Sequence, residues 1–268
     1  MLGAIIGDIS GSRFEWDNIK VKEFELLPKD ECFPTDDSVM TVAIANAILK
    51  CEGDFAALSD EAVAQMRWFG QRDLSAGYGG RFFEWLLNPM PRPYSSYGNG
   101  AAMRVSPCAY AAKTLEEAKD LSMKVTAVTH NHPEGLKGAE ATTVAIWMAL
   151  HGKKMQEIRD VINETYYPMN FTLDEIRPNY EFNETCQGTV PQALTAFFES
   201  TGFEDAIRNA ISIGGDSDTL AAITGSVAEA YYGIPTDLRN QAFDFLDDTL
   251  SKTVRSFETK YGIPPLRA

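Results

Sequence analysis

Apolar residues recur at helical spacing along most of the chain, and no stretch alternates apolar and polar residues as a half-buried strand would. We also find no tandem repeat and no low-complexity tract. The pattern therefore predicts a compact, mostly all-α single domain covering residues 1–268. The predicted helical segments are residues 1–15, 35–48, two segments within 59–88, 114–128, 137–151, 153–165, a helix from 189 onward, 203–212, 216–233 and 236–259.

The first predicted helix carries a stripe of glycines. Gly3, Gly7 and Gly11 recur every four residues, and each costs about 1 kcal/mol of helix propensity relative to alanine. We therefore expect this face to pack closely against a neighbouring element. Asp8 and Glu15 lie seven residues apart and would share nearly one face of this helix. Glu15 would stand at the unfavourable end of the helix dipole, so it is either held there by another group or simply solvated.

Composition narrows the class of protein. The chain has 268 residues, 44% of them hydrophobic, which is enough for a sizeable core. Its net charge of −14 argues against non-specific binding to nucleic acid or to anionic membranes. No apolar run reaches the length of a membrane span, and the first residues lack the features of a signal peptide. The four cysteines are scattered, so we expect reduced thiols and a cytoplasmic protein.

Two predicted helix starts, far apart in the chain, are rich in oxygen-bearing side chains. In the later one, two glycines lead into aspartates that are two residues apart, which cannot share one face of a regular helix. Such aspartates converge only in the turn before a helix or in its first turn, where glycine allows a tight backbone. The side chains at the two starts are Thr35, Asp36 and Asp37, and Asp216, Asp218 and Thr219.

Each helix start has two interpretations. Asp, Ser and Thr are the preferred N-cap residues, so capping alone could explain either one. Adjacent acids repel, however, unless a cation lies between them. If the two starts face one another, four carboxylates and two hydroxyls would suit two hard divalent cations, Mg²⁺ or Mn²⁺. The set contains no thiol or imidazole, which disfavours zinc and copper.

Two further segments carry candidate chemistry. Residues 94–105 run from a polar, glycine-rich turn into a helix, where free N–H groups could bind an anion, although an ordinary turn and cap is the simpler interpretation. His130 and His132 are accompanied by no further histidine or cysteine, so we expect capping or a hydrogen bond to substrate instead of a zinc site.

Five motifs, in order along the chain, resemble the ADP-ribosylglycohydrolase family, which includes the dinitrogenase reductase-activating glycohydrolases and the ADP-ribosyl-acceptor hydrolases. Each motif alone is weak, but together they extend over nearly the whole chain. Many relatives have Asp-Thr-Asp-Thr in the last motif, where this chain has Ser217 at a position that is not a matched ligand. The motifs are Gly7–Glu15, Pro34–Ser38, Tyr97–Arg104, Thr129–His130 and Gly214–Thr219.

The resemblance implies an all-helical domain with two divalent cations, Mg²⁺ or Mn²⁺, at the base of an ADP-ribose cleft. Glu15 matches an acidic residue that serves in catalysis in part of the family, and Asp36 is a second candidate for general base or acid. The matched metal ligands are Thr35, Asp36, Asp37, Asp216, Asp218 and Thr219. The matched substrate-binding residues are Ser96, Tyr97, Gly98, Asn99, Gly100, Met103, Arg104 and His130.

The implied activity is hydrolysis at C1″ of the distal ribose, which releases ADP-ribose from a protein side chain or a small molecule. The diphosphate would lie on the N–H groups of the 96–100 loop. A non-catalytic, crystallin-like binder of the same fold and a two-metal phosphohydrolase remain alternatives. We expect a monomer without direct nucleic-acid binding, and we expect acceptor specificity in residues 163–187 or 71–98.

Overall fold

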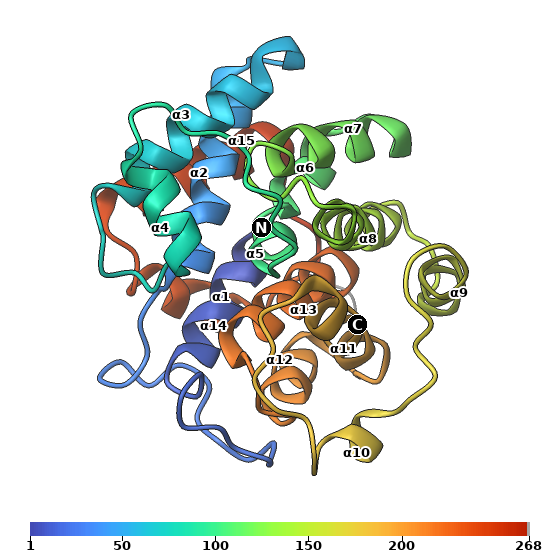
Figure 1. The fold of residues 1–268 in the computed structure, drawn as a ribbon. Helices are drawn as coiled ribbons and strands as arrows, with labels where there is room; N and C mark the ends of the chain where they lie inside the picture. Colours follow the sequence, from blue (N-terminus) through green and yellow to red (C-terminus); the bar gives the residue numbers. More distant parts are fainter. Residues whose placement is uncertain (267–268) are drawn as a thin grey trace.

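The computed structural model describes residues 1–266 as helices joined by turns and extended connections (Figure 1). This range contains no β-strand, and Gly98 and Thr185 form an isolated antiparallel bridge. The predicted all-α fold is therefore confirmed. The elements are α1 (Leu2–Ser12), α2 (Asp36–Lys50), the 3₁₀ turn η1 (Phe55–Ala57), α3 (Leu58–Gly70), α4 (Gly80–Leu87), α5 (Gly100–Met103), α6 (Ser106–Ala111), α7 (Leu115–Thr126), α8 (Pro133–Leu150), α9 (Met155–Thr165), α10 (Leu173–Ile176), α11 (Cys186–Phe198), α12 (Phe203–Ile211), α13 (Ser217–Tyr232), α14 (Thr236–Phe243) and α15 (Asp248–Tyr261).

Four predicted helix boundaries are wrong. The helix expected from residue 137 begins at Pro133, because the His132 side chain caps it by accepting the N–H of Glu134. The first helix ends at Ser12, so Glu15 lies in the turn after α1 and not on its last turn. The Ser12 hydroxyl donates to the Ile9 carbonyl at 2.9 Å and accepts the N–H of Phe33, which favours an end there. The helix expected from residue 189 begins at Cys186, because the Thr185 side chain caps it by accepting the N–H of Gly188.

The last predicted helix, residues 236–259, is two helices. α14 ends at Phe243, and α15 begins after Asp247, whose carboxylate accepts the N–H groups of Thr249 and Leu250 at 2.8 Å. An N-cap aspartate of this kind starts a new helix and lets the chain turn between the two. This correction affects the periphery of the fold and not the site described below.

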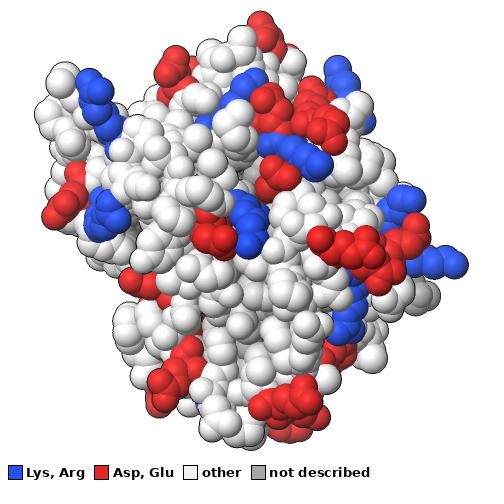
Figure 2. Space-filling model, turned by 45° about the vertical axis from the view of Figure 1, so that its right-hand side comes forward, with Lys and Arg blue, Asp and Glu red and all other residues white. Residues whose placement is uncertain are grey.

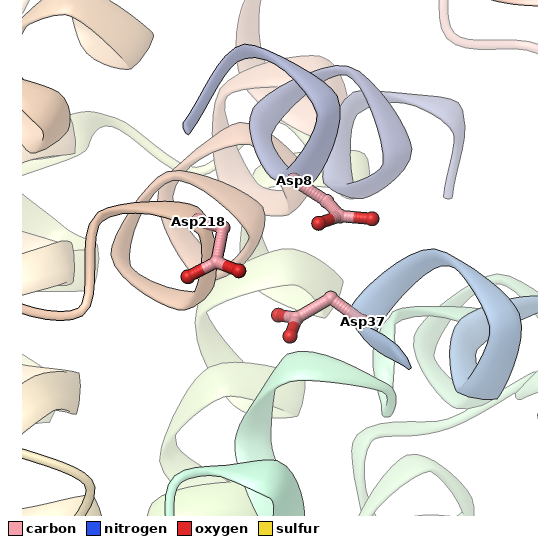
Figure 3. Close-up of side chains that lie close together, drawn as sticks. All are labelled: Asp8, Asp37 and Asp218. Atoms are coloured by element: carbon pink, nitrogen blue, oxygen red, sulfur yellow. The ribbon is translucent and has the colours of Figure 1, made fainter. Parts of the chain in front are cut away.

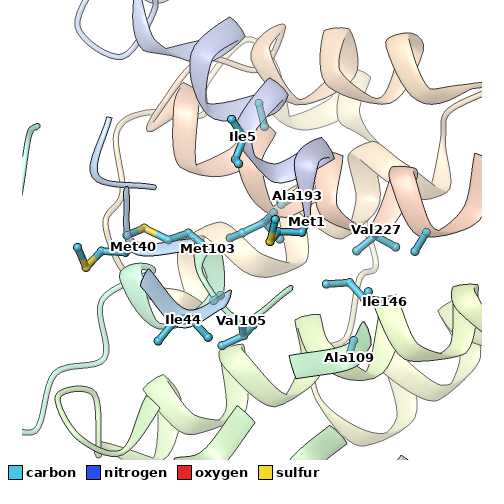
Figure 4. Packing of buried hydrophobic residues seen from close by; sticks show 14 of the residues in the cluster. Met1, Ile5, Met40, Ile44, Met103, Val105, Ala109, Ile146, Ala193 and Val227 are labelled. Carbon is cyan, nitrogen blue, oxygen red and sulfur yellow. The ribbon is translucent and has the colours of Figure 1, made fainter. Parts of the chain in front are cut away.

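One hydrophobic core joins helices that lie far apart in the sequence. α1 lies near the middle of the molecule and runs antiparallel along α13, while α2, α5, α8, α11, α12 and α14 pack around the pair (Figure 1). Figure 4 shows side chains from several of these helices meeting in one buried layer. The labelled side chains are Met1, Ile5, Met40, Ile44, Met103, Val105, Ala109, Ile146, Ala193 and Val227.

The glycine stripe of α1 packs directly on the backbone of α13. A Cβ atom added at Gly7 would lie 2.0 Å from the carbonyl oxygen of Ala221, and one added at Gly3 would lie 2.3 Å from that of Gly225. At the other end of α1, a Cβ on Gly11 would lie 2.5 Å from the Cα of Asp218. The predicted close packing is therefore confirmed, and it fixes the start of α13 beside the end of α1.

The surface carries both signs of charge. Figure 2 shows several groups of acidic side chains on one face, with basic side chains between them. Within the part of the chain that the structure describes, no helix combines the length and apolarity needed to cross a bilayer.

Helix propensity favours alanine over glycine, but the close contact between α1 and α13 predicts that alanine in the glycine stripe destabilises the protein. Gly7→Ala should lower the free energy of unfolding by about 2 kcal/mol or more, because the added methyl meets backbone that cannot move aside alone. The measurement is urea unfolding followed by circular dichroism. Gly80→Ala is the matched control, since a Cβ there meets nothing within 4 Å and stability should be unchanged or slightly raised. Equal effects of the two substitutions would contradict the backbone contact.

Candidate active site

A cleft of about 530 Å³ opens between the starts of α2 and α13 and the loops around them. It is lined by every residue that the sequence predicted for substrate binding, together with Glu15. Five of the six predicted metal ligands also line it, while Thr35 lies behind them and is buried. The candidates that line the cleft are Glu15, Asp36, Asp37, Ser96, Tyr97, Gly98, Asn99, Gly100, Met103, Arg104, His130, Asp216, Asp218 and Thr219.

The start of α13 forms the first wall. Gly214 and Gly215 have φ of +69° and +76°, in the left-handed region that glycine tolerates best. The following residue, Asp216, occupies the N-cap position, but its side chain makes no capping hydrogen bond. Instead, its carboxylate accepts the side-chain N–H of Asn99 at 2.7 Å. The simple capping interpretation of Asp216 is therefore wrong, and its carboxylate is directed across the cleft.

The start of α2 forms the opposite wall and depends on Asp8, a residue for which the sequence suggested no role in the site. Asp8 extends from α1 and is fully buried. Its carboxylate accepts the Thr35 N–H at 2.9 Å, the Thr35 hydroxyl at 2.6 Å, the Ser38 N–H at 3.0 Å and the Ser38 hydroxyl. The only signal in the sequence was an acid flanked by the glycine stripe. Thr35 also accepts the N–H of Asp37 at 3.4 Å and so caps α2 as expected.

The two walls bring carboxylates together. Oxygen atoms of Asp8, Asp37 and Asp218 lie within 4.8 Å of one another, and Figure 3 shows these side chains pointing toward a common centre from α1, α2 and α13. Asp218 also belongs to a second such group, with Glu15 and Asp216. The Thr219 hydroxyl donates to Asp37 at 3.2 Å and so connects α13 to α2. The other Asp37 oxygen is buried without a hydrogen-bond partner.

Burial and mutual repulsion raise the pKa values of these acids. Burial, and then the charges of Asp8, Asp216 and Glu15, raise the pKa of Asp36 to about 8. The pKa values of Asp37 and Asp218 rise well above the usual range for the same reasons. For Glu15, burial and then Asp216 raise the pKa to about 7.

The donor set fits hard divalent cations. Among residues 1–266, no lysine or arginine forms an ion pair with these carboxylates. A cluster of buried acids without a counter-charge is unstable unless it is protonated or binds a cation. All of the ligand atoms on offer are oxygens, which Mg²⁺ and Mn²⁺ prefer.

Cationic and aromatic side chains line another part of the cleft. The buried guanidinium of Arg104 donates to the Thr129 hydroxyl at 2.6 Å and lies 5.5 Å from the ring centre of Phe82. Burial lowers the pKa of Arg104 to about 10, which leaves it charged at neutral pH. His130 contacts the same hydroxyl through Nδ1 at 2.7 Å, and burial and then Arg104 lower its pKa well below the usual value. His130 is therefore a neutral hydrogen-bonding group in the cleft.

His132 has the expected capping role, since its Nδ1 accepts the N–H of Glu134 at 3.1 Å at the start of α8.

The 96–100 loop differs from an open cradle of N–H groups. Gly98 donates its N–H to the Ser96 hydroxyl at 3.2 Å, and Asn99 donates its N–H to the Glu184 carbonyl at 2.8 Å. Two of the N–H groups expected to meet a diphosphate are therefore engaged within the protein, because residues 183–185 pack on this loop.

Several cleft residues were not predicted. Apart from Arg81 and Phe82, which belong to α4, they come from segments without a helical pattern. The sequence assigned no chemistry to any of them, although it expected acceptor specificity in the ranges that hold most of them. Their aromatic side chains and an arginine were the only signal. These residues are Trp16, Tyr78, Arg81, Phe82, Tyr94, Phe182, Glu184 and Thr185.

The chain is similar to proteins that act on ADP-ribosyl groups. It is 24% identical to human ADP-ribosylhydrolase ARH3 (87% of this chain, 84% of the relative) and 26% identical to the ADP-ribosylarginine hydrolase Tri1 of Pseudomonas putida (87% and 70%). It is 27% identical to the ADP-ribosyl-dinitrogen reductase glycohydrolase of Rhodospirillum rubrum (82% and 76%). A solved structure described as an ADP-ribosylglycohydrolase-related protein complex matches the fold with a TM-score of 0.65 at 24% identity, covering 94% of this chain and 96% of that one.

The family model described as ADP-ribosylglycohydrolase matches residues 1–262. This range contains both helix starts, the 96–100 loop and all of the carboxylates that meet in the cleft. The chain belongs to the ADP-ribosylglycohydrolase family.

Proposed function

We propose that this protein is a metal-dependent hydrolase that cleaves the C1″ glycosidic bond between ADP-ribose and an acceptor, and so releases ADP-ribose. The observation that carries the proposal is the buried set of carboxylates without counter-charge at the base of a 530 Å³ cleft. The family and the hydrolase names of the relatives support this chemistry. The acceptor would be a protein side chain or a small molecule.

The cations would be held by the two helix starts. Asp8 is not proposed as a ligand, because four hydrogen bonds already occupy its oxygens, and it instead positions the start of α2. When bound, two Mg²⁺ or Mn²⁺ ions would supply Lewis acidity, which orients ribose hydroxyls and lowers the pKa of water. The proposed ligands are Thr35, Asp36, Asp37, Asp216, Asp218 and Thr219.

Glu15 is the candidate for proton transfer. It is the half-buried member of the cluster, so it can exchange protons with water, and its carboxylate lies within 4.8 Å of those of Asp216 and Asp218. The water oxygen bonds to C1″ as the bond from C1″ to the acceptor atom breaks. Glu15 accepts the proton that the water loses and passes it to the departing acceptor atom, so that Glu15 ends the cycle as it began. Asp36, which lines the same cleft, is the alternative candidate for general base or acid.

Other cleft residues, on the wall of Arg104 and His130, would bind the ADP moiety. Arg104 and the neutral His130 lie on one wall and offer a charge and a hydrogen bond to the anionic diphosphate. Since the N–H groups of Gly98 and Asn99 are engaged, side chains would contribute more to diphosphate binding than the loop backbone. Tyr97, exposed at the cleft, offers a flat surface to the adenine.

Removing one cluster carboxylate should abolish hydrolysis. We expect Asp218→Asn to reduce ADP-ribose release from ADP-ribosylated protein by about a hundred-fold or more, since several kcal/mol of transition-state stabilisation depend on the intact cluster. The measurement is chromatography of released ADP-ribose with Mg²⁺ or Mn²⁺ present, on protein shown to be folded by circular dichroism.

The matched control is Asp60→Asn, an exposed acid in the first turn of α3, which should keep wild-type rates. Undiminished release by the Asp218 variant would overturn the assignment. Wild-type protein that binds ADP-ribose without turnover would favour the non-catalytic alternative, and release of inorganic phosphate would favour a phosphohydrolase.

The raised pKa values predict an unusual pH dependence for metal-free protein. Folded Asp36 and Glu15 hold protons up to about pH 8 and 7, whereas the unfolded chain loses them near pH 4 or so. The folded state thus binds more protons within this window, and the free energy of unfolding falls as pH rises through it. We expect the Tm of EDTA-treated protein to be lower at pH 8 than at pH 6.

Saturating Mg²⁺ or Mn²⁺ should raise the Tm more at pH 8 than at pH 6, because the ions bind ionised carboxylates. Asp36→Asn should flatten the metal-free pH dependence. A metal-free Tm that increases from pH 6 to pH 8 would show that the cluster is ionised in the folded protein.

A further inference from the structure

Two solvent-exposed aromatic side chains stack on each other at the entrance of the cleft. Trp16 is 79% exposed and Phe182 is 42% exposed, and both line the cleft. Their ring centres are 5.1 Å apart, and the planes differ by 20°. Large apolar side chains that remain together in water at a cleft often mark a binding surface. The proposed hydrolysis assigns no role to this pair.

Hydrogen bonds hold the two chain segments that carry these rings at the carboxylate end of the cleft. On the Trp16 side, Asn18 accepts the Gly215 N–H at 2.7 Å and donates to the Gly215 carbonyl at 2.9 Å, next to Asp216. Trp16 itself follows Glu15, whose carboxylate lies within 4.8 Å of those of Asp216 and Asp218.

The Phe182 side is held to the same place. The ring of Tyr180 lies against Gly215, where an added Cβ would be 2.4 Å from it, and the Tyr180 hydroxyl donates to the Gly188 carbonyl at 2.7 Å. Lys20, from the same loop as Trp16, donates to the Tyr180 carbonyl at 2.7 Å. The two rings therefore face each other from two chain segments that are both fixed beside the start of α13.

Charge is distributed unevenly around the cleft. The arginines that line it, Arg81 and Arg104, lie on the wall of Phe82, Tyr94 and His130, where Arg81 stacks 4.8 Å from the ring centre of Tyr94. The lining residues around the aromatic pair are instead acidic, namely Glu15, Glu184 and Asp216. Lys20 forms no ion pair with these acids, because its ammonium donates to the carbonyls of Tyr180 and Ile213.

We propose that Trp16 and Phe182 form the acceptor subsite and select a flat, positively charged leaving group, of which the arginine guanidinium is the protein example. If C1″ lies beside the carboxylate cluster, the group bonded to C1″ is the part of the substrate that reaches these rings. A guanidinium stacks on indole and phenyl faces, and surrounding acids favour its charge. A serine acceptor offers neither a plane nor a charge, so the pair would contribute nothing to its binding.

Adenine is the other flat group in the substrate, but the position of the pair argues against it. In ADP-ribose the diphosphate and two riboses separate adenine from C1″, whereas Trp16 directly follows Glu15 in the cluster. Adenine has a separate candidate surface at Tyr97, whose ring lies 5.0 Å from that of His132. The proposal depends on the hydrolase function above, because it identifies C1″ by its place at the carboxylates.

The test compares two peptides of one sequence that carry ADP-ribose on arginine or on serine. Trp16→Ala and Phe182→Leu should each lower kcat/KM for the arginine-linked peptide by about ten-fold, chiefly through KM. Release from the serine-linked peptide and calorimetric binding of free ADP-ribose should not change. Trp16→Phe should keep most of the arginine-linked activity. The control is Trp68→Ala, an exposed tryptophan of α3 outside the cleft, with wild-type behaviour on all three ligands.

The outcomes separate the two proposals. Weaker binding of free ADP-ribose to Trp16→Ala would assign the pair to the ADP moiety and overturn the acceptor subsite. Equal losses on both peptides, no loss on either, or wild-type cleavage of the serine linkage alone would overturn it as well, with the hydrolase function intact. If wild-type protein released ADP-ribose from neither peptide nor from other ADP-ribosylated acceptors, the proposed function itself would fail.

Discussion

The contact between the backbones of α1 and α13 is the constraint on which the cleft depends. Because α1 presents glycines, its Gly11 lies against Asp218 itself, and one turn earlier its Asp8 holds the start of α2. A single helix with a glycine face thus positions two walls that are far apart in the sequence, as the hydrogen bond from Thr219 to Asp37 illustrates. Repeated glycine destabilises α1 as an isolated helix, and the close packing of α1 on α13 offsets this cost.

The same packing creates an electrostatic conflict. Burial raises the pKa values of five acids in this space, and neighbouring acids raise those of Glu15, Asp36, Asp37 and Asp218 further. Threonine hydroxyls and the Asn99 amide compensate only part of the repulsion. Folded proteins tolerate such conflicts mainly where function requires them. The cleft therefore holds a strong preference for positive charge at its base, and the acidic surroundings of Trp16 and Phe182 extend that preference to its mouth.

The sequence allowed the all-α fold, the glycine contact and the facing helix starts to be predicted, because each depends on local pattern. At the start of α13, for example, the glycine before Asp216 and the spacing of the two aspartates were enough to predict a tight turn with converging carboxylates. Asp8 was missed because its role depends on Thr35 and Ser38 beside it in space. Phe182 was missed because residues 163–187 have no periodic pattern, and contacts with Gly215 and Asn99 set their path. The break after Phe243 depended on one cap, Asp247.

The hydrogen bonds of Asp8 bear on the order in which the molecule is assembled. They complete the start of α2 from protein groups alone, so Asp36 and Asp37 reach their places while the chain folds. In a zinc finger, by contrast, the ion is part of the folding reaction and the apo chain is disordered. Under the proposed function, metal loading would be a late, reversible step on a finished scaffold, and the ions could exchange without the protein having to refold.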